Sequence, residues 1–131
     1  MKKLSKSNED YLECLYLLEN EGGKIRSFVI AERLGVSKPA VTKAMHNLQE
    51  MGLVEKSNYS EIILTKKGRE KATLILDKHN LIKAFLIAIG VDEATAAIDC
   101  CKIEHILSKE TLLAFKNFID SNKQKTATDI Y

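Results

Sequence analysis

One stretch of sequence decides the fold: residues 27–48 read SFVIAERLGVSKPAVTKAMHNL. The stretch predicts two short helices separated by a sharp turn at Gly35, because glycine adopts turn conformations that other residues avoid. Ser37 is a suitable N-cap for the second helix, and Pro39 is tolerated in a first helical turn, where amide hydrogens lack partners. One interpretation is a DNA-binding helix pair, in which the second helix lies in a DNA groove. The other is an ordinary helical hairpin inside a core, which has the same sequence pattern.

The outer face of the second predicted helix holds candidate DNA contacts. Val41, Met45 and Leu48 form its apolar stripe and are expected to be buried. The remaining side chains are small or polar, so they can approach base edges or hydrogen-bond to bases and phosphates. The candidates are Ser37, Lys38, Pro39, Ala40, Thr42 and Lys43, with His46 beside them.

A hairpin is expected directly after this helix pair. Residues 54–56 and 62–64 read as short strands, joined by a polar tip at residues 57–61. A helix pair followed by such a hairpin is a winged helix-turn-helix, in which Lys56 and the polar tip are expected to reach the phosphate backbone. The combined pattern from Ile30 to Gly68 favours DNA binding over the core hairpin.

Helices are predicted for most of the remaining chain, so the fold class is mainly α. Ser7 or Asn8 is expected to cap a first helix that ends near Asn20, before two glycines. Later helices are expected at about residues 66–89, 93–107 and 109–122, the last two with Asp92 and Ser108 as their N-caps. We expect a winged helix-turn-helix DNA-binding domain at residues 1–71 and an all-helical domain at residues 72–131.

The all-helical domain has more apolar surface than one copy is expected to cover. Self-association follows most simply as a two-fold homodimer. Two-fold symmetry would place two recognition helices on successive major grooves of double-stranded DNA, which predicts a palindromic operator.

Composition narrows the class of protein only slightly. The 131 residues are 45% hydrophobic and 29% charged, with a net charge of +2. No apolar run approaches the ~20 residues of a bilayer span, and no signal peptide opens the chain, so we expect a cytoplasmic protein with no membrane partner. Three cysteines do not make a disulfide framework and are expected to be thiols, available as ligands.

A cluster of metal-binding residue types lies in the second half of the chain. Cys101, Glu104 and His105 are spaced i, i+3, i+4, so thiol, carboxylate and imidazole share one helical face. This mixture suits divalent transition metals. His79 lies in a polar patch of the preceding helix, and Asp10 and Glu13 project from one side of the first helix. Alternatively, Cys101 fills a core, the other side chains are solvated, and Asp10 only complements a helix dipole.

The chain resembles the diphtheria-toxin-repressor family of metal-dependent transcriptional repressors, over about residues 9–119. The resemblance implies a winged-helix DNA-binding domain joined to a helical dimerisation and metal-binding domain, without the additional domain of longer members. It implies that metal-loaded dimers bind operators of metal-uptake genes. The markers are Glu9-Asp10-Tyr11, the helix pair, Leu64-Thr65-Lys66-Lys67-Gly68, Lys78-His79, Gly90-Val91-Asp92 and Cys101-Lys102-Ile103-Glu104-His105.

The resemblance also implies a ligand set with mixed features. The positions that match the manganese-type members are Asp10, Glu13, His79, Glu104 and His105. Cys101 matches the iron-type members instead, in which the same C-x-x-E-H pattern occurs. Lys83 and Ala97 replace an acid and a histidine of the iron type's second site. One or two ions per subunit are therefore expected, Fe(II) first and Mn(II) second.

The expected mechanism is a metal that holds ligands from both domains and so fixes the spacing of the recognition helices. A different reading is a winged-helix regulator controlled by a non-metal effector or a protein partner. A metal-dependent enzyme is not expected, because the sequence has no glycine-rich phosphate loop or activated nucleophile.

Overall fold

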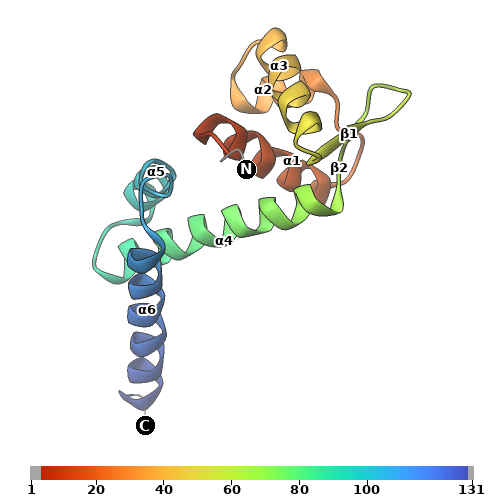
Figure 1. The fold of residues 1–131 in the computed structure, drawn as a ribbon. Helices are drawn as coiled ribbons and strands as arrows, with labels where there is room; N and C mark the ends of the chain where they lie inside the picture. The colour runs from red at the N-terminus through yellow and green to blue at the C-terminus, as the bar shows by residue number, and fades with distance from the viewer. Residues whose placement is uncertain (1–3, 130–131) are drawn as a thin grey trace. The chain divides into compact units, whose positions relative to one another are not determined.

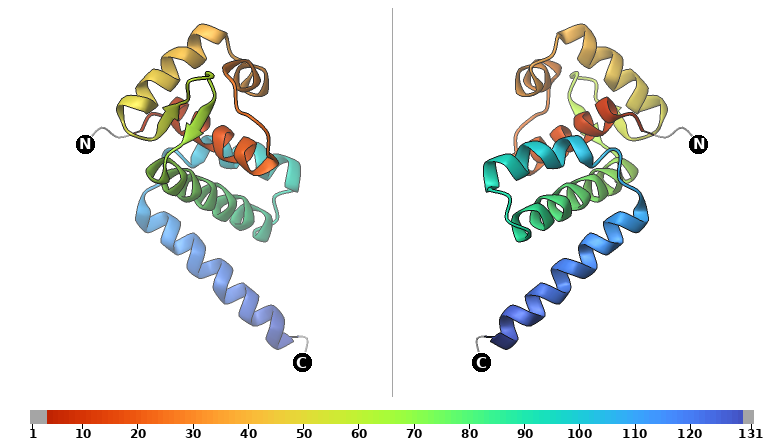
Figure 2. Two further views of the ribbon diagram at one scale, coloured as in Figure 1. Left: turned by 90° about the vertical axis from the view of Figure 1, so that its right-hand side faces the viewer. Right: turned by 90° about the vertical axis from the view of Figure 1, so that its left-hand side faces the viewer.

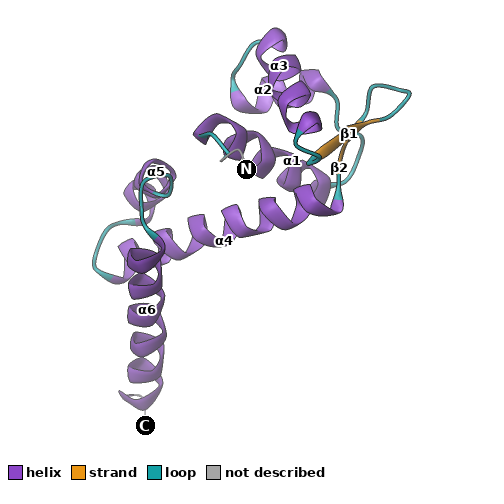
Figure 3. Cartoon of the chain, in the orientation of Figure 1, coloured by secondary structure: helices purple, strands orange, loops and turns teal. Residues whose placement is uncertain are grey.

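The computed structural model describes residues 4–129, with side chains described up to residue 122, and it is mainly helical (Figures 1 and 3). Two compact units divide within the fourth helix, one at residues 1–75 and the other at residues 76–131. The elements in chain order are α1 (Lys6–Glu21), α2 (Ser27–Leu34), α3 (Lys38–Glu50), β1 (Val54–Lys56), β2 (Ile62–Leu64), α4 (Lys66–Ala88), α5 (Glu93–Ile103) and α6 (Lys109–Asp129).

The first unit is a winged helix-turn-helix. Gly35 ends α2 in the left-handed conformation, with φ 66° and ψ 37°, which allows the predicted turn. Ser37 then begins α3 as its N-cap, since its Oγ accepts a hydrogen bond of 3.2 Å from the amide of Ala40. The core beneath the helix pair consists of apolar side chains from every element of the unit, including Leu12, Leu15, Ile30, Val41, Leu48 and Leu53.

The wing is the antiparallel pair of β1 and β2, which has the predicted bounds. Val54 lies opposite Leu64, and Lys56 lies opposite Ile62. Alternate side chains of β2 are buried, so one face of the hairpin packs on the helices while Ile63 faces outward. The loop between the strands extends away from α2 and α3 in Figure 1, and Figure 2 shows the two strands side by side.

The start of α4 is fixed against the wing by Thr65. Its hydroxyl donates to the carbonyl of Gly52 at 2.7 Å and accepts from the amide of Gly68 at 3.0 Å. A Cβ at Gly68 would collide with the carbonyl oxygen of Leu53, so only glycine fits this approach. Arg69, on the next turn, pairs with Glu19 of α1, with Nη2 2.5 Å from Oε1.

The second unit consists of the rest of α4 with α5 and α6. Asp92 and Ser108 cap α5 and α6 as expected, accepting from the amides of Thr95 at 3.3 Å and Thr111 at 3.2 Å. Phe85 of α4 stacks on Phe115 of α6, with ring centroids 3.8 Å apart. Several large apolar side chains of this unit are exposed over 40–78% of their surface, which accords with the predicted self-association: Ile87, Ile89, Ile98, Ile106, Leu113 and Phe118.

Three helix ends differ from the prediction. Ser5, rather than Ser7 or Asn8, caps α1 and accepts from the amide of Asn8 at 3.1 Å. Helix α5 ends at Ile103, so Glu104 is its C-cap and His105 follows the helix. Helix α6 continues to Asp129 rather than ending near residue 122, because the polar residues that follow are mostly good helix formers. None of the described helices is long and apolar enough to cross a membrane.

Candidate metal centre and nucleic-acid interface

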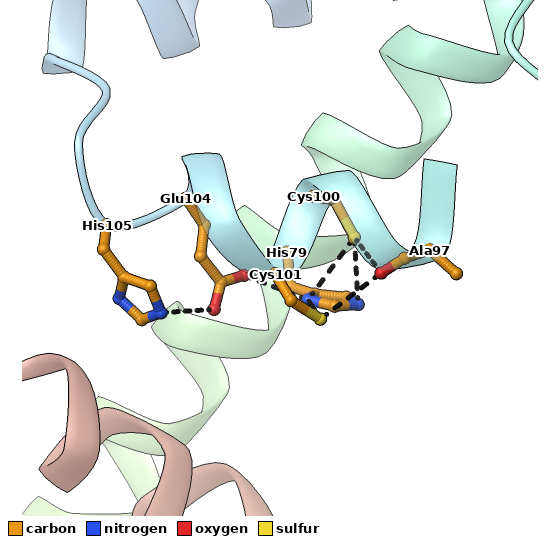
Figure 4. Close-up of polar contacts among 6 residues, drawn as sticks. All are labelled: His79, Ala97, Cys100, Cys101, Glu104 and His105. Atoms are coloured by element: carbon orange, nitrogen blue, oxygen red, sulfur yellow. Dashed lines mark hydrogen bonds and ion pairs between the residues drawn. The ribbon is translucent and has the colours of Figure 1, made fainter. Parts of the chain in front are cut away.

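His79 of α4 lies at the centre of a cluster of metal-binding side chains in the second unit (Figure 4). Its Nδ1 is 3.0 Å from Oε2 of Glu104. The same nitrogen is 3.7 Å from the sulfur of Cys100 and 3.7 Å from the sulfur of Cys101. Two thiols and a carboxylate, all at the C-terminal end of α5, thus surround one imidazole.

Glu104 is the one charged side chain that is fully buried among the described residues, with 2% of its surface exposed. Its second oxygen, Oε1, is 3.3 Å from Nε2 of His105. Burial raises the pKa of the carboxyl group, while the imidazoles of His79 and His105 and the ammonium of Lys78 oppose that rise. A carboxylate buried between two imidazoles is an arrangement that a divalent cation stabilises.

The spacing of these donor atoms fits a coordination shell. Atoms that share one ion at roughly 2.0–2.3 Å lie about 3.0–3.8 Å from one another. The distances of 3.0 Å and 3.7 Å from Nδ1 of His79 to its carboxylate and thiol neighbours fall in that range. Sulfur, nitrogen and oxygen donors together suit a first-row transition metal. The donor set therefore fits the ion that the sequence predicts.

Sequence reasoning left Cys100 without a role, yet the structure brings it into the cluster. Cys100 is buried and Cys101 is exposed, and both thiols donate to the carbonyl of Ala97 at 3.3 Å. The available signal was the i, i+4 spacing of Cys100 and Glu104, which puts both on one side of α5.

Asp10 and Glu13 lie on α1 of the first unit, three residues apart and half-buried. Their carboxylates therefore project from neighbouring positions on one side of that helix, as the sequence predicts. Lys83 lies one helical turn after His79, and its Nζ is 3.8 Å from Oε1 of Glu93.

Most of the predicted DNA-contact residues are exposed on α3 and the wing. Ser37, Lys38, Pro39, Thr42, Lys43 and Lys56 are exposed, and Ala40 is half-buried. The hydroxyl of Thr42 donates to the carbonyl of Lys38 at 3.1 Å, so toward DNA it can act as an acceptor. His46 pairs with Glu50 on its own helix at 3.2 Å.

The structure links the predicted tip of the wing to Arg26, a residue to which sequence reasoning gave no role. Arg26 donates from Nη1 to the backbone carbonyl of Tyr59 at 3.3 Å, which ties the hairpin loop to the segment before α2. Tyr59 itself is 79% exposed at the tip. An aromatic side chain at the end of a wing is available for contact with a partner.

Known proteins resemble the chain over nearly its whole length. Residues 3–62 match the family described as "Iron dependent repressor, N-terminal DNA binding domain", and residues 65–129 match "Iron dependent repressor, metal binding and dimerisation domain". An HTH-type transcriptional regulator of Methanocaldococcus jannaschii is 43% identical over 124 residues, which cover 93% of this chain and 99% of that protein.

Two further relatives support the same grouping. The transcriptional regulator MntR of Escherichia coli O6:H1 is 36% identical over 117 residues, covering 89% of this chain and 76% of MntR. The solved structure of the manganese regulator SloR superposes with a TM-score of 0.76 at 32% identity, covering 86% of this chain and 53% of SloR.

Proposed function

The chain belongs to the iron-dependent repressor family of metal-dependent, DNA-binding transcriptional regulators, and on this premise we propose how its own residues connect a metal to an operator. Members of this family are regulators and not enzymes, and their C-terminal domain serves dimerisation. We assign DNA binding to residues 1–71, and dimerisation with metal binding to residues 72–131.

We propose six ligands for one or two divalent ions per subunit: Asp10, Glu13, His79, Cys101, Glu104 and His105. The observation that carries this proposal is the buried carboxylate of Glu104, which lies 3.0 Å from His79 and 3.3 Å from His105. A fully buried carboxylate without a compensating cation is costly, so this position favours a cation. Asp10 and Glu13 complete the set by their match to the family's ligands.

Fe(II) is the proposed ion, with Mn(II) as the second candidate. The thiolate of Cys101 favours iron, because soft sulfur ligands disfavour manganese. The carboxylates of Asp10 and Glu13 are ligands that manganese prefers, so manganese remains a candidate ion. The likeness to SloR, a manganese regulator, also supports manganese. When bound, the ion supplies positive charge that compensates the carboxylates.

Metal binding by these ligands would restrict the position of the DNA-binding unit. Asp10 and Glu13 sit on α1, which packs under the helix pair through Leu12 and Leu15. Engaging their carboxylates in the metal centre would order α1 and fix the separation of the two α3 helices in the dimer. The Ser37–Lys43 surface and Lys56 would then reach successive major grooves and flanking phosphates of a palindromic operator. We therefore propose that the protein is cytoplasmic and represses metal-uptake genes.

Replacing Asp10 by alanine tests the proposal. We expect Asp10→Ala to weaken metal-stimulated operator binding at least about tenfold. Mutating a residue that only orients a metal ligand already lowers metal affinity by about tenfold or more, and removing a ligand itself should cost no less. The dimer should persist. Fluorescence anisotropy with a labelled operator duplex gives the affinity, and sedimentation velocity gives the oligomeric state.

The matched control is Asp120→Ala, the same substitution at an exposed position of α6. It should retain the response of the unaltered protein to metal. If Asp10→Ala and Asp120→Ala bind the operator alike across a metal titration, α1 supplies no ligand. Control by a non-metal effector would then be the better account.

A further inference from the structure

The sulfur of Cys100 lies against the ring of His79. Cys100 is completely buried on α5, and its Sγ is 3.4 Å from Nε2 and 3.7 Å from Nδ1 of the imidazole. A sulfur at those distances in the plane of the ring would overlap the carbon between the two nitrogens, so this sulfur lies over one face of the ring. Figure 4 shows the ring nearly edge-on, with the Cys100 sulfur above it.

This placement excludes Cys100 as a partner of His79 in one coordination shell. A sulfur and a ring nitrogen that share an ion lie about 3.6 Å apart, and the second nitrogen of that ring is then about 5 Å from the sulfur. The Cys100 sulfur is instead within 3.7 Å of both nitrogens. Its relation to His79 is therefore packing.

Helix α5 holds the Cys100 sulfur in place. The thiol donates to the carbonyl of Ala97, three residues earlier, at 3.3 Å. A fully buried side chain that is also bonded to its own helix has little freedom to move. The ring of His79 thus packs against a fixed surface.

The ring of His79 benefits from such a support because its own torsion is soft. Rotation of a histidine ring about the Cβ–Cγ bond has broad energy wells. A large rotation here would drive one edge of the ring into the Cys100 sulfur. In the present orientation Nδ1 is 3.0 Å from Oε2 of Glu104 and 3.7 Å from the sulfur of Cys101. The sulfur of Cys100 therefore keeps Nδ1 beside two of the proposed ligands.

We propose that Cys100 is a positioning residue of the metal centre, whose sulfur holds the His79 ring so that Nδ1, and not Nε2, binds the ion. The inference deepens the proposed function and rests on it, since it takes His79, Glu104 and Cys101 as ligands. A ligand that is already held in its binding orientation loses less conformational freedom when the ion binds. Cys100 thereby raises metal affinity without touching the metal.

Cobalt(II) titration of the full-length, reduced protein measures this effect. Cys100→Ala removes the sulfur from the ring face and should lower Co(II) affinity about tenfold or more, as loss of a ligand's support does in other metal sites. Cys100→Ser keeps a heavy atom on that face and a donor for the carbonyl of Ala97, so it should lose less affinity than Cys100→Ala. Equal affinities of Cys100→Ala and the unaltered protein would overturn the proposal.

Ile82→Val is the control for a general loss of packing, because Ile82 is also completely buried in the second unit and lies on α4 with His79. It should lower the thermal midpoint, as removal of a buried methyl group does, while Co(II) affinity stays unchanged. If Ile82→Val and Cys100→Ala lose the same affinity, weaker core packing explains the loss and Cys100 has no positioning role.

Two spectroscopic readouts separate positioning from ligation. At saturation, the sulfur-to-cobalt charge-transfer absorbance per bound ion should be equal in Cys100→Ser and the unaltered protein, because Cys101 supplies the thiolate. A fall in Cys100→Ser would make Cys100 a ligand and contradict the inference. Long-range proton–nitrogen NMR of the zinc-loaded, unaltered protein should show the ion on Nδ1 of His79, and an ion on Nε2 would equally contradict it.

The proposed function and this inference fail in different ways. If α1 supplies no ligand, Asp10→Ala binds operator and cobalt like the unaltered protein, while Cys100→Ala still loses cobalt affinity. If Cys100 does not hold the ring, Cys100→Ala keeps the full cobalt affinity whatever the operator assay gives. An unaltered protein that binds no Co(II) would overturn both.

Discussion

At the scale of single residues, Glu104 places an ionisable carboxyl group in the interior of the second unit. Its carboxyl is buried, and burial raises its pKa above the ordinary value of 4.5. A carboxyl whose pKa is raised by folding stabilises the fold while it is protonated, and that contribution is lost as the pH rises through the folded pKa. The position is therefore suited to binding a cation more than to stabilising the metal-free protein.

We expect Glu104→Gln to raise the thermal midpoint of the metal-free protein at pH 8 and to abolish the further rise that metal produces. The gain over the unaltered protein should shrink as the pH falls towards 4.5, where the carboxyl of the unaltered protein becomes protonated. Calorimetry with chelator and with Mn(II) gives both quantities. A metal-induced rise that survives in Glu104→Gln would remove this residue from the ligand set.

Lys43 is exposed on α3 and belongs to the proposed DNA-contact surface. Lys43→Ala should weaken operator binding at every metal concentration and lower the salt dependence of log K by about 1, because one phosphate contact is lost. The comparison variant is Lys71→Ala, which removes the same charge from an exposed position on α4. Equal affinities of the two variants in a gel-shift titration would show that Lys43 does not contact DNA.

Residue types and spacing indicated part of the metal cluster in advance. The i, i+3, i+4 spacing of Cys101, Glu104 and His105 predicted that they converge, and Glu104 does lie beside His105. Spacing along one helix could not show that His79 of α4 contacts that face, because this depends on how α4 packs against α5. It also could not distinguish Cys100 from Cys101, since one is buried and the other exposed only after that packing.

At the scale of helices and strands, the predicted helix boundaries are correct where a single residue type determines them. Ser37, Asp92 and Ser108 cap the helices that they were predicted to cap. Ser5, Ser7 and Asn8 are all good caps, so the sequence could not select among them. The end of α5 was missed because residues 104–106 contain no glycine or proline, so no local signal marks the stop after Ile103.

The junction of the wing with α4 depends on a single glycine. Gly68→Ala should destabilise the first unit by roughly 2 kcal/mol, because an added methyl group meets the carbonyl of Leu53 and the backbone must shift. Urea unfolding measures the change. Glu70→Ala, an exposed change on the same helix, should be nearly neutral. A loss below about 0.5 kcal/mol for Gly68→Ala would contradict the tight approach.

At the scale of the whole molecule, two units share one helix, α4, and carry different tasks. The first unit presents α3 and the wing, and the second holds the His79–Glu104 cluster and the exposed apolar side chains. A ligand couples such units only if it binds the DNA-competent state more tightly than the other states. Coupling of about 1–3 kcal/mol would change operator affinity by roughly 5–150-fold.

Operator binding by the unaltered dimer, titrated with Fe(II) under anaerobic conditions and in parallel with Mn(II), tests this coupling most directly. The account predicts that affinity rises with added metal by a factor in that range and returns to its starting value when a chelator removes the ion. Metal analysis of the loaded dimer should find at least one ion per subunit. An operator affinity that is the same with metal and with chelator would contradict the account.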